Sequence, residues 1–397
     1  MPVRQIVKKE ELLECGRIQS IAFVAPWDRM EALKKLDDPE IPRNTTLGFF
    51  DQEEKLTACL ELPTYQARYQ GKVIPITGVG GVASLPEHRK GGAVRRLFTY
   101  TLPWMRDQGA VFSCLYPFSH SFYRKFGYEL CQLPTAWQVP AESLRHLPCS
   151  CQVDMLQPGC DLSPLKQVYE AYLGQCQLAI QREDRHWREL LGKASYKDRR
   201  YSYLFSQEGK ALSYVVIQAE NDGPYSKAGV VRELAWSCPQ GLREALGFLN
   251  RLAAQYGRFR ITLPQGTLLP TLVDECYDCK PSCHDQPMAR VLQAAEAFRL
   301  RPLAQGVRCR VAVEDPFLPE NTGVFALTGA GDHTQVEQLP LSEEWDLSVD
   351  PGTLTQLLLG TLTLEEALCK PQVTLRDNAQ ALEQAFPKAA VFLNEYF

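Results

Sequence analysis

Features that would place a protein in a membrane, outside the cell or on nucleic acid are missing from this sequence. No apolar run reaches the length of a transmembrane helix, and residues 1–19 lack the charged, apolar and small segments of a secretory signal. No block of basic residues is present, and the net charge of −4 argues against a nucleic-acid-binding surface. We therefore expect a cytoplasmic protein with no membrane or nucleic-acid partner.

The composition is that of a folded protein with several domains. Hydrophobic residues make up 45% of the chain and charged residues 23%, which is ordinary for a globular protein. A single hydrophobic core stops growing at about 250–300 residues. The 397 residues of this chain therefore predict two or three domains.

Fourteen cysteines are scattered along the chain, and we expect them to stay reduced, as in other large cytosolic enzymes. One cluster stands out, because Cys276, Cys279, Cys283 and His284 carry side chains that bind zinc. The cluster is confined to one short loop and lacks a distant second pair of ligands. We favour incidental free thiols and no bound metal, with structural zinc as the alternative.

Residues 80–92 form the most informative stretch of the sequence. They read as a buried strand that ends at Pro86 and leads through a basic, glycine-rich turn into a helix over 91–108. Such a turn directs several backbone N–H groups and the positive end of a helix at one point. Arg89 and Lys90 would add positive charge beside them. The pattern favours a pyrophosphate site, and tight turn geometry alone is the alternative.

The order of predicted elements in the first part of the chain recurs in the second. Each copy has a hairpin, a strand that ends near a proline, a helix, and a further strand that ends at a proline. The first copy comprises helices at 10–22, 27–35 and 91–108 and strands at 46–50, 56–62, 72–85, 111–116 and 128–138; the second comprises strands at 203–206, 211–219, 230–237 and 259–263 and a helix at 241–255.

We interpret this recurrence as an internal duplication of one α/β unit. Residues 238–243 of the second copy read Cys-Pro-Gln-Gly-Leu-Arg, with neither the basic pair nor the double glycine. An anionic cofactor is therefore expected at the first copy only. The second copy is expected to have a structural or substrate-shaping role.

A third region follows the cysteine loop. It is predicted to contain strands at 306–314, 323–328 and 346–349 and helices at 291–298, 351–359, 364–369 and 379–386. The chain then ends in the apolar, aromatic segment 391–397. Most termini fray, so this composition predicts that the last residues are packed inside the protein, and a packing role alone is the favoured interpretation from the residues.

Three motifs together resemble a known family. The pattern Val-x-Ser-x-Pro-x-x-Arg-x-x-Gly over residues 82–92, followed by a helix, resembles the acetyl-CoA motif of the GNAT acyltransferases, although Val94 stands where glycine or alanine is usual. The run 116–129 contains Phe-Tyr-x-x-Phe-Gly-Tyr, and 313–321 reads Val-x-Asp-Pro-Phe-Leu-Pro-Glu-Asn. Over essentially the whole chain, these residues resemble the Eis (enhanced intracellular survival) family of N-acetyltransferases.

This resemblance implies an α/β (α+β) protein with two tandem GNAT-like domains and a C-terminal domain similar to sterol carrier proteins. The corresponding boundaries are 1–145 for the domain that binds acetyl-CoA, 146–285 for a degenerate second GNAT-like domain, and 286–397 for the C-terminal domain. Family members commonly form hexamers, so a homo-oligomer is implied as well. The resemblance thus agrees with the three-part organisation predicted from the elements.

The implied reaction moves an acetyl group from acetyl-CoA to a primary amine. An amine at neutral pH is mostly protonated, because a lysine-like amine has a pKa of about 10.4, so a general base is needed. The resemblance assigns the acid that protonates the departing sulfur to Tyr123 and the base to the α-carboxylate of Phe397. A free α-carboxyl group has a pKa of about 3.5, so it is a weak base unless it is desolvated or acts through water. We favour a relay through water to a partly buried carboxylate.

The resemblance also implies a set of cofactor-binding residues. Arg89, Lys90 and the N–H groups of 91–95 would hold the pyrophosphate, and residues 82–84 would pair with the pantetheine amides as an added strand does. The full set is Val82, Ala83, Ser84, Arg89, Lys90, Gly91, Gly92, Ala93, Val94, Arg95, Phe118 and Ser119.

The amine pocket should be anionic and aromatic, because such a surface attracts cations. Trp27, Asp28, Glu395 and Tyr396 are the candidates, and ordinary surface or packing roles are the alternative. The family acetylates aminoglycosides, polyamines or lysines, and the sequence does not choose among them. The competing function is a non-catalytic protein whose C-terminal domain binds a small molecule or lipid.

Overall fold

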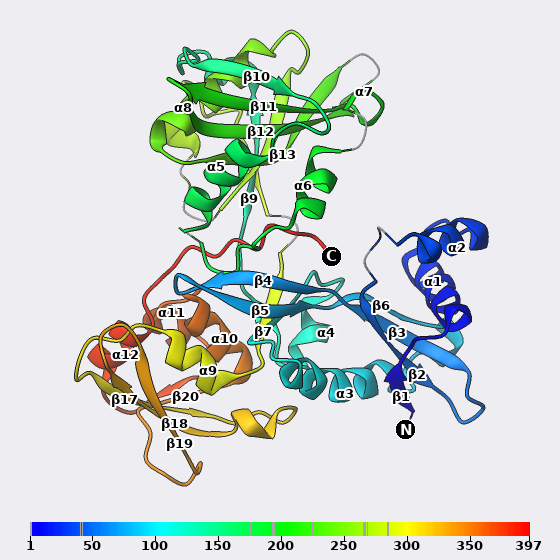
Figure 1. The fold of residues 1–397 in the computed structure, drawn as a ribbon. Helices are drawn as coiled ribbons and strands as arrows, with labels where there is room; N and C mark the ends of the chain where they lie inside the picture. Colours follow the sequence, from blue (N-terminus) through cyan, green and yellow to red (C-terminus); the bar gives the residue numbers. More distant parts are fainter. Residues whose placement is uncertain are drawn as a thin grey trace. The chain divides into compact units, whose positions relative to one another are not determined.

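The computed structural model describes residues 2–39, 41, 43–174, 176–192, 195–223, 226–264, 267, 269–283 and 286–397. The chain divides into two compact units (Figure 1). The first unit comprises Met1–Cys131, Pro287–Lys388 and Glu395–Phe397, and the second comprises Gln132–Gln286 and Ala389–Asn394. Each unit is therefore assembled from segments that are far apart in the sequence.

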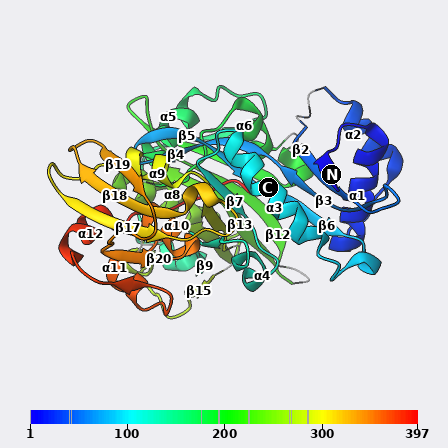
Figure 2. The same ribbon diagram turned by 90° about the horizontal axis from the view of Figure 1, so that it is seen from below.

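The first unit begins with an antiparallel sheet covered on both faces by helices. The strands, in spatial order, are β1 (Val3–Gln5), β2 (Thr45–Phe50), β3 (Leu56–Leu62) and β6 (Gly80–Ser84). The helices of this part are α1 (Lys9–Phe23), α2 (Arg29–Asp37) and α3 (Ala93–Asp107). Figure 2 shows α1 and α3 in a second view.

Alternation along β3 explains why both faces of this sheet are covered. Cys59 packs in one hydrophobic cluster with residues of α1, whereas its neighbours Ala58 and Leu60 pack in another cluster with residues of α3. Successive side chains of a strand point to opposite faces, so a strand with apolar side chains on both faces needs a partner on each face.

A second sheet of the first unit contains a strand from much later in the chain. Its order is β4 (Thr64–Tyr69), β5 (Lys72–Gly78), β7 (Phe112–Leu115), β16 (Met288–Val291) and β8 (Glu129–Leu130). The short helix α4 (His120–Arg124) connects β7 to β8. The strand β16 thus lies between β7 and β8, although all the strands of the second unit separate it from them in the sequence.

The second unit repeats this topology. Its sheet has the order β10 (Gln152–Leu156), β11 (Arg200–Gln207), β12 (Lys210–Asn221), β13 (Lys227–Trp236), β14 (Arg258–Leu263), β9 (Thr135–Pro140) and β15 (Lys280–Ser282). Its helices are α5 (Ser163–Leu173), α6 (Asp184–Leu191), α7 (Ser195–Asp198) and α8 (Pro239–Arg251). The parallel pair β13 and β14 corresponds to β5 and β7, and β9 takes the place that β16 takes in the first unit.

The two units have therefore exchanged one strand. β9 follows β8 in the sequence but pairs in the second unit, and β16 follows β15 but pairs in the first. The single strand expected at 128–138 is wrong, because Pro134 separates two short strands that belong to different sheets. The helix expected at 291–298 is also displaced, since α9 begins only at Ala294, after β16.

The third region belongs to the first unit and forms a sheet of its own. The strand order is β19 (Thr334–Leu339), β18 (Gly323–Gly329), β17 (Arg308–Val313), β20 (Leu347–Val349) and β21 (Thr374–Leu375). The helices are α9 (Ala294–Leu300), α10 (Pro351–Leu359), α11 (Leu364–Leu368) and α12 (Ala379–Ala385). Every residue of α10 is buried, which agrees with its run of leucines.

One buried ion pair joins the exchanged strand to the third region. Nη2 of Arg290, on β16, donates to Asp315 Oδ1 at 2.6 Å and Oδ2 at 2.8 Å, and both side chains are fully buried. Nη1 of Arg290 donates to the carbonyl oxygen of Phe126, just after α4. A buried guanidinium is tolerated only when it is paired in this way.

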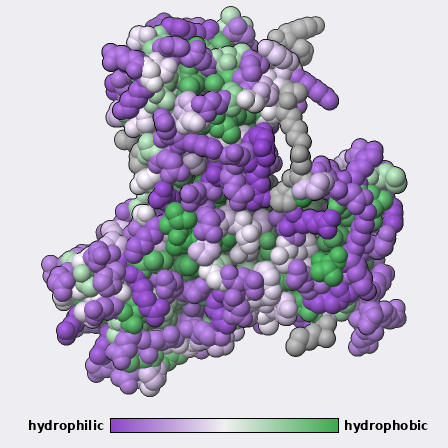
Figure 3. Space-filling view, in the orientation of Figure 1, coloured by the Kyte–Doolittle hydropathy of each residue, from purple (hydrophilic) through white to green (hydrophobic). Residues whose placement is uncertain are grey.

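Hydrophilic side chains cover most of the face of the molecule shown in Figure 3. Among the residues that the structure describes, no helix combines the length and the apolar character needed to span a bilayer.

We expect Asp315→Asn to lower the free energy of unfolding by about 3–5 kcal/mol, because it leaves the buried charge of Arg290 uncompensated. Urea denaturation measures this change. The matched control is Asp332→Asn, since Asp332 is exposed and pairs with His333, which is exposed as well. Equal unfolding midpoints for the two variants would contradict the structural role of the Arg290–Asp315 pair.

Candidate active site

The site begins where two parallel strands separate. β5 pairs with β7 as far as Gly78 opposite Cys114, and the Val79 N–H still donates to the Cys114 carbonyl at 2.8 Å. Beyond this point the chain continues as β6, which pairs only with β3 within the described part of the chain. The other edge of β6 is left for hydrogen bonds with an extended amide chain.

A bulge shapes the start of β6. Its pairing with β3 shifts between Cys59 and Glu61, and Gly81 has φ +57°. The Gln19 amide, on α1, donates to Glu61 Oε1 at 2.8 Å and to the Gly81 carbonyl at 3.3 Å. An added Cβ at Gly81 would displace the Gln19 amide from these hydrogen bonds, and the positive φ also favours glycine at the bulge.

The turn after β6 leaves the first N–H groups of α3 without a capping side chain. Lys90 and Gly92 have φ values of +66° and +79°, and Gly92 is the N-cap of α3 with no side-chain hydrogen bond. These N–H groups and the positive end of the helix favour an anion. Arg89 and Lys90 are exposed beside them.

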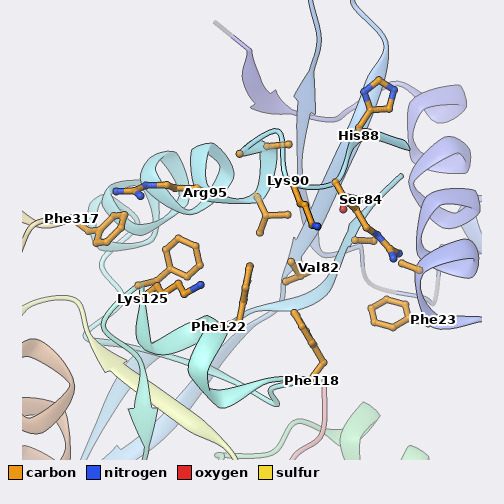
Figure 4. Close-up of a pocket in the computed structure, with 17 residues that line it drawn as sticks. Phe23, Val82, Ser84, His88, Lys90, Arg95, Phe118, Phe122, Lys125 and Phe317 are labelled. Atoms are coloured by element: carbon orange, nitrogen blue, oxygen red, sulfur yellow. The ribbon is translucent and has the colours of Figure 1, made fainter. Parts of the chain in front are cut away.

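A cavity of about 770 Å³ extends along β6, this turn and α4 (Figure 4). Ten of the predicted cofactor-binding residues line it: Val82, Ala83, Ser84, Arg89, Lys90, Gly92, Ala93, Val94, Arg95 and Phe118. Gly91 instead lines a second cavity of about 1030 Å³. Ser119 lines neither cavity, and its hydroxyl group lies 3.1 Å from that of Ser121. The unpaired strand edge fits the amides of a pantetheine chain. The N–H groups at the helix start and the adjacent cations fit a pyrophosphate.

Sequence reasoning missed seven other residues that line the larger cavity. They are Ala22, Phe23, His88, Phe122, Lys125, Phe126 and Phe317. A signal for some of them is present, because Phe118, Phe122 and Phe126 recur every fourth residue. This spacing brings aromatic side chains to one face of a helical turn.

The last residue of the chain lies on the glycines that lead into β6. An added Cβ would lie 2.5 Å from the Phe397 ring at Gly78 and 3.3 Å from the Phe397 carboxyl carbon at Gly80. The ring also contacts Tyr65 and Tyr116, with centroid distances of 5.4 and 5.6 Å. The α-carboxylate is therefore brought to the start of the strand that lines the cavity.

Tyr123 is a buried residue of α4, with 3% of its surface exposed. Its ring packs against Phe118 and Phe122, which line the cavity, at centroid distances of 5.4 and 5.2 Å. Tyr123 itself is not among the lining residues. Burial raises the pKa of the Tyr123 phenol well above its usual value, so the group stays protonated at neutral pH.

The predicted amine-binding residues fall into two groups. Glu395 and Tyr396 lie beside Tyr116, whose hydroxyl group donates to the Glu395 carbonyl at 3.0 Å and whose ring centroid is 4.5 Å from that of Tyr396. Asp28 instead caps α2 by accepting the Glu31 N–H at 2.8 Å.

Trp27 packs against α1, where an added Cβ at Gly16 would lie 2.9 Å from its Nε1. Neither Trp27 nor Asp28 lines the two cavities.

Glu61 is a further acidic residue at this place that sequence reasoning missed. It lies directly opposite Gly80 in the pairing of β3 with β6, so its side chain shares a face of the sheet with the terminal carboxylate. Asn44 Nδ2 donates to Glu61 Oε2 at 3.3 Å. The signal in the sequence was a single charged residue in the otherwise apolar strand 56–62.

Comparison with protein families now identifies the fold. An acetyltransferase (GNAT) domain matches residues 4–131, another acetyltransferase (GNAT) domain matches 178–291, and a sterol carrier protein domain matches 293–394. The chain is a GNAT acetyltransferase. Enzymes of this class use acetyl-CoA as co-substrate, which is the molecule that the cavity fits.

Solved structures share the fold of this acetyltransferase over its whole length. A GCN5-related N-acetyltransferase from Anabaena variabilis is 20% identical, with a TM-score of 0.87 and all of both chains covered. Eis1 from Mycobacterium abscessus is also 20% identical, with a TM-score of 0.81 and all of both chains covered. A GCN5-related N-acetyltransferase from Kribbella flavida is 22% identical, with a TM-score of 0.80, and covers 100% of this chain and 98% of its own.

No curated protein matches the sequence. The predicted fold class, the acetyltransferase activity and the use of acetyl-CoA are confirmed, and the resemblance to the Eis family is confirmed for the fold. The division at residues 145 and 285 and the roles of the individual site residues stay predictions.

We expect Gly78→Ala to loosen the last residue, because the new methyl group overlaps the Phe397 ring. Overpacking of this kind costs about 1–3 kcal/mol, so carboxypeptidase should release Phe397 about 5- to 100-fold faster than from the wild type. Gly257→Ala is the control, since an added Cβ there meets nothing within 4 Å. Equal release from both variants would show that Gly78 does not hold the terminus.

Proposed function

We propose that this acetyltransferase transfers an acetyl group from acetyl-CoA to a primary amine of a small cationic substrate. The observation that carries the proposal is the position of the Phe397 carboxyl carbon against Gly80, where β6 begins just beyond the end of the β5–β7 pairing. A weak base at this point and an activated thioester along β6 form the two halves of an acyl-transfer site. Bound acetyl-CoA supplies that thioester.

The chain's own residues hold the co-substrate. The unpaired edge of β6, with Val82 and Ser84, pairs with the pantetheine amides. The N–H groups at the start of α3, with Arg89 and Lys90, bind the pyrophosphate. Phe118 covers the cavity from the α4 side.

The terminal carboxylate removes the proton from the substrate ammonium. An α-carboxylate is a weak base, with a pKa of about 3.5 in water, so the proton passes through a water molecule to the carboxylate. Contacts of the Phe397 ring with Tyr65 and Tyr116 hold the carboxylate in place. Loss of the proton allows the amine nitrogen to attack the thioester carbonyl carbon.

Tyr123 returns a proton to the departing sulfur. Burial keeps its phenol protonated, and only a protonated phenol can donate. Its ring packs against Phe118 and Phe122, which line the cavity. Tyr128, which is fully buried and hydrogen-bonded to Ser113, has a structural role instead.

The negative charge at the start of β6 favours a substrate with more than one ammonium group. Glu61 and the terminal carboxylate share a face of the sheet, and Tyr116 and Tyr396 add aromatic surface. Two carboxylates and aromatic rings attract cations. Aminoglycosides, polyamines and lysine side chains all have this character, and an amine screen with thiol-release detection chooses among them.

The homo-oligomeric state, a hexamer in the family that the chain resembles, and the cytoplasmic location stay predictions. Light scattering of the purified protein and cell fractionation test them.

We expect that residues added after Phe397 lower kcat by about 100-fold or more, because the α-carboxylate then becomes an amide. The Kd of acetyl-CoA, measured by calorimetry, should change by less than about threefold, since Phe397 is not part of the cofactor cavity. The control is the same extension placed before Met1. Unchanged turnover in the C-terminally extended protein would remove the terminal carboxylate from the mechanism.

We expect Glu61→Gln to raise KM for polycationic amines about tenfold, because a charge-assisted hydrogen bond is lost. KM for acetyl-CoA and for a monoamine should stay nearly constant. Glu337→Gln, on the exposed side of β19, controls for the change in net charge. A uniform rise of KM for all amines would mean that Glu61 stabilises the bulge at Gly81 and does not bind the charged substrate.

A further inference from the structure

One wall of the cofactor cavity comes from the sterol carrier protein region. Phe317, in the run that follows β17, lines the cavity, whereas the other lining residues lie between Ala22 and Phe126. Figure 4 shows Phe317 at one end of the cavity, near Arg95, and Phe23 and Ser84 at the other.

The direction of the co-substrate follows from the two ends already described. The thioester must lie near Gly80, where the Phe397 carboxylate is found, and the pyrophosphate must lie at the turn before α3. The nucleotide extends beyond the pyrophosphate, away from the thioester. Phe126 and Phe317 line the cavity, as does Lys125, and we assign the nucleotide to them.

From this arrangement, which rests on the proposed function, we infer that Phe317 and Phe126 bind the adenine of acetyl-CoA and that Lys125 binds its 3′-phosphate. The ring centroids of Phe126 and Phe317 are 5.6 Å apart. Aromatic faces at such spacing form a surface on which a base stacks.

Lys125 supplies the charge for this end of the cavity. It is exposed, lines the cavity, and has no ion-pair partner among the residues that the structure describes. Figure 4 shows its side chain directed toward Phe122. An ammonium group is well suited to a phosphate that is partly exposed to water.

The Arg290–Asp315 ion pair positions this wall. The Asp315 carboxylate accepts the N–H groups of Phe317 at 3.0 Å and Leu318 at 3.1 Å. Arg290, its partner, also donates to the Phe126 carbonyl oxygen. A single guanidinium thus holds both sides of the aromatic wall, which gives the sterol carrier protein region a direct part in cofactor binding.

The test is calorimetric titration with CoA, 3′-dephospho-CoA and pantetheine, which reads binding without turnover. Phe317→Ala should weaken binding of both nucleotides about 5- to 100-fold, the range produced by loss of one base–aromatic stack, and leave pantetheine unaffected. Lys125→Gln should weaken CoA about fivefold or more and leave 3′-dephospho-CoA unchanged.

Two further variants keep the result interpretable. Phe317→Leu preserves apolar packing but removes the aromatic face, so it should weaken the binding of CoA. It serves as the test variant if Phe317→Ala does not fold. Leu341→Ala, an exposed position of the same region outside the cavity, should bind CoA like the wild type.

Unchanged CoA affinity in folded Phe317→Leu, or an equal loss for pantetheine, would overturn the inference. So would failure of the wild type to bind CoA, which would overturn the proposed function with it. Wild-type CoA binding that depends on Phe317, without acetylation of any amine, would leave the inference standing and defeat the proposed function alone.

Discussion

The guanidinium group of Arg290 holds together parts of the first unit that lie far apart in the sequence. It belongs to the exchanged strand β16, it pairs with Asp315 after β17, and it donates to the carbonyl of Phe126 after α4. A charge with no exposure to water is stable only with such partners, so β16, α4 and the third region are held in one arrangement. The cofactor cavity is built on that arrangement.

The site itself depends on the separation of two parallel strands. Because pairing of β5 with β7 ends at Gly78 and Cys114, β6 has an unpaired edge, and the two glycines before the bulge leave room for Phe397. The same glycines would be unremarkable in any other strand. Here they bring the terminal carboxylate to the end of the cavity where acyl transfer requires a base.

Local features of the site were predictable from the sequence because local residues produce them. The turn before α3 needs a proline, residues that tolerate positive φ and an uncapped helix start, and all of these lie within 86–92. Most predicted cofactor residues line the cavity for this reason. The strand β16 was not predictable in this way, because Arg290 interrupts a four-residue apolar run and its partner Asp315 is distant.

The sequence by itself therefore determined the repeated α/β units, the anion-binding turn and the apolar terminus, since each depends on short-range patterns of side chains. Only the tertiary structure decided which distant residues lie next to these features. It brought Phe397 to Gly80, set Glu61 opposite that glycine, and placed Phe317 in the cavity wall. It also put Asp28 at a helix cap, away from both cavities. The physical reason is that long-range pairing and burial, unlike turns and caps, depend on partners that no local pattern specifies.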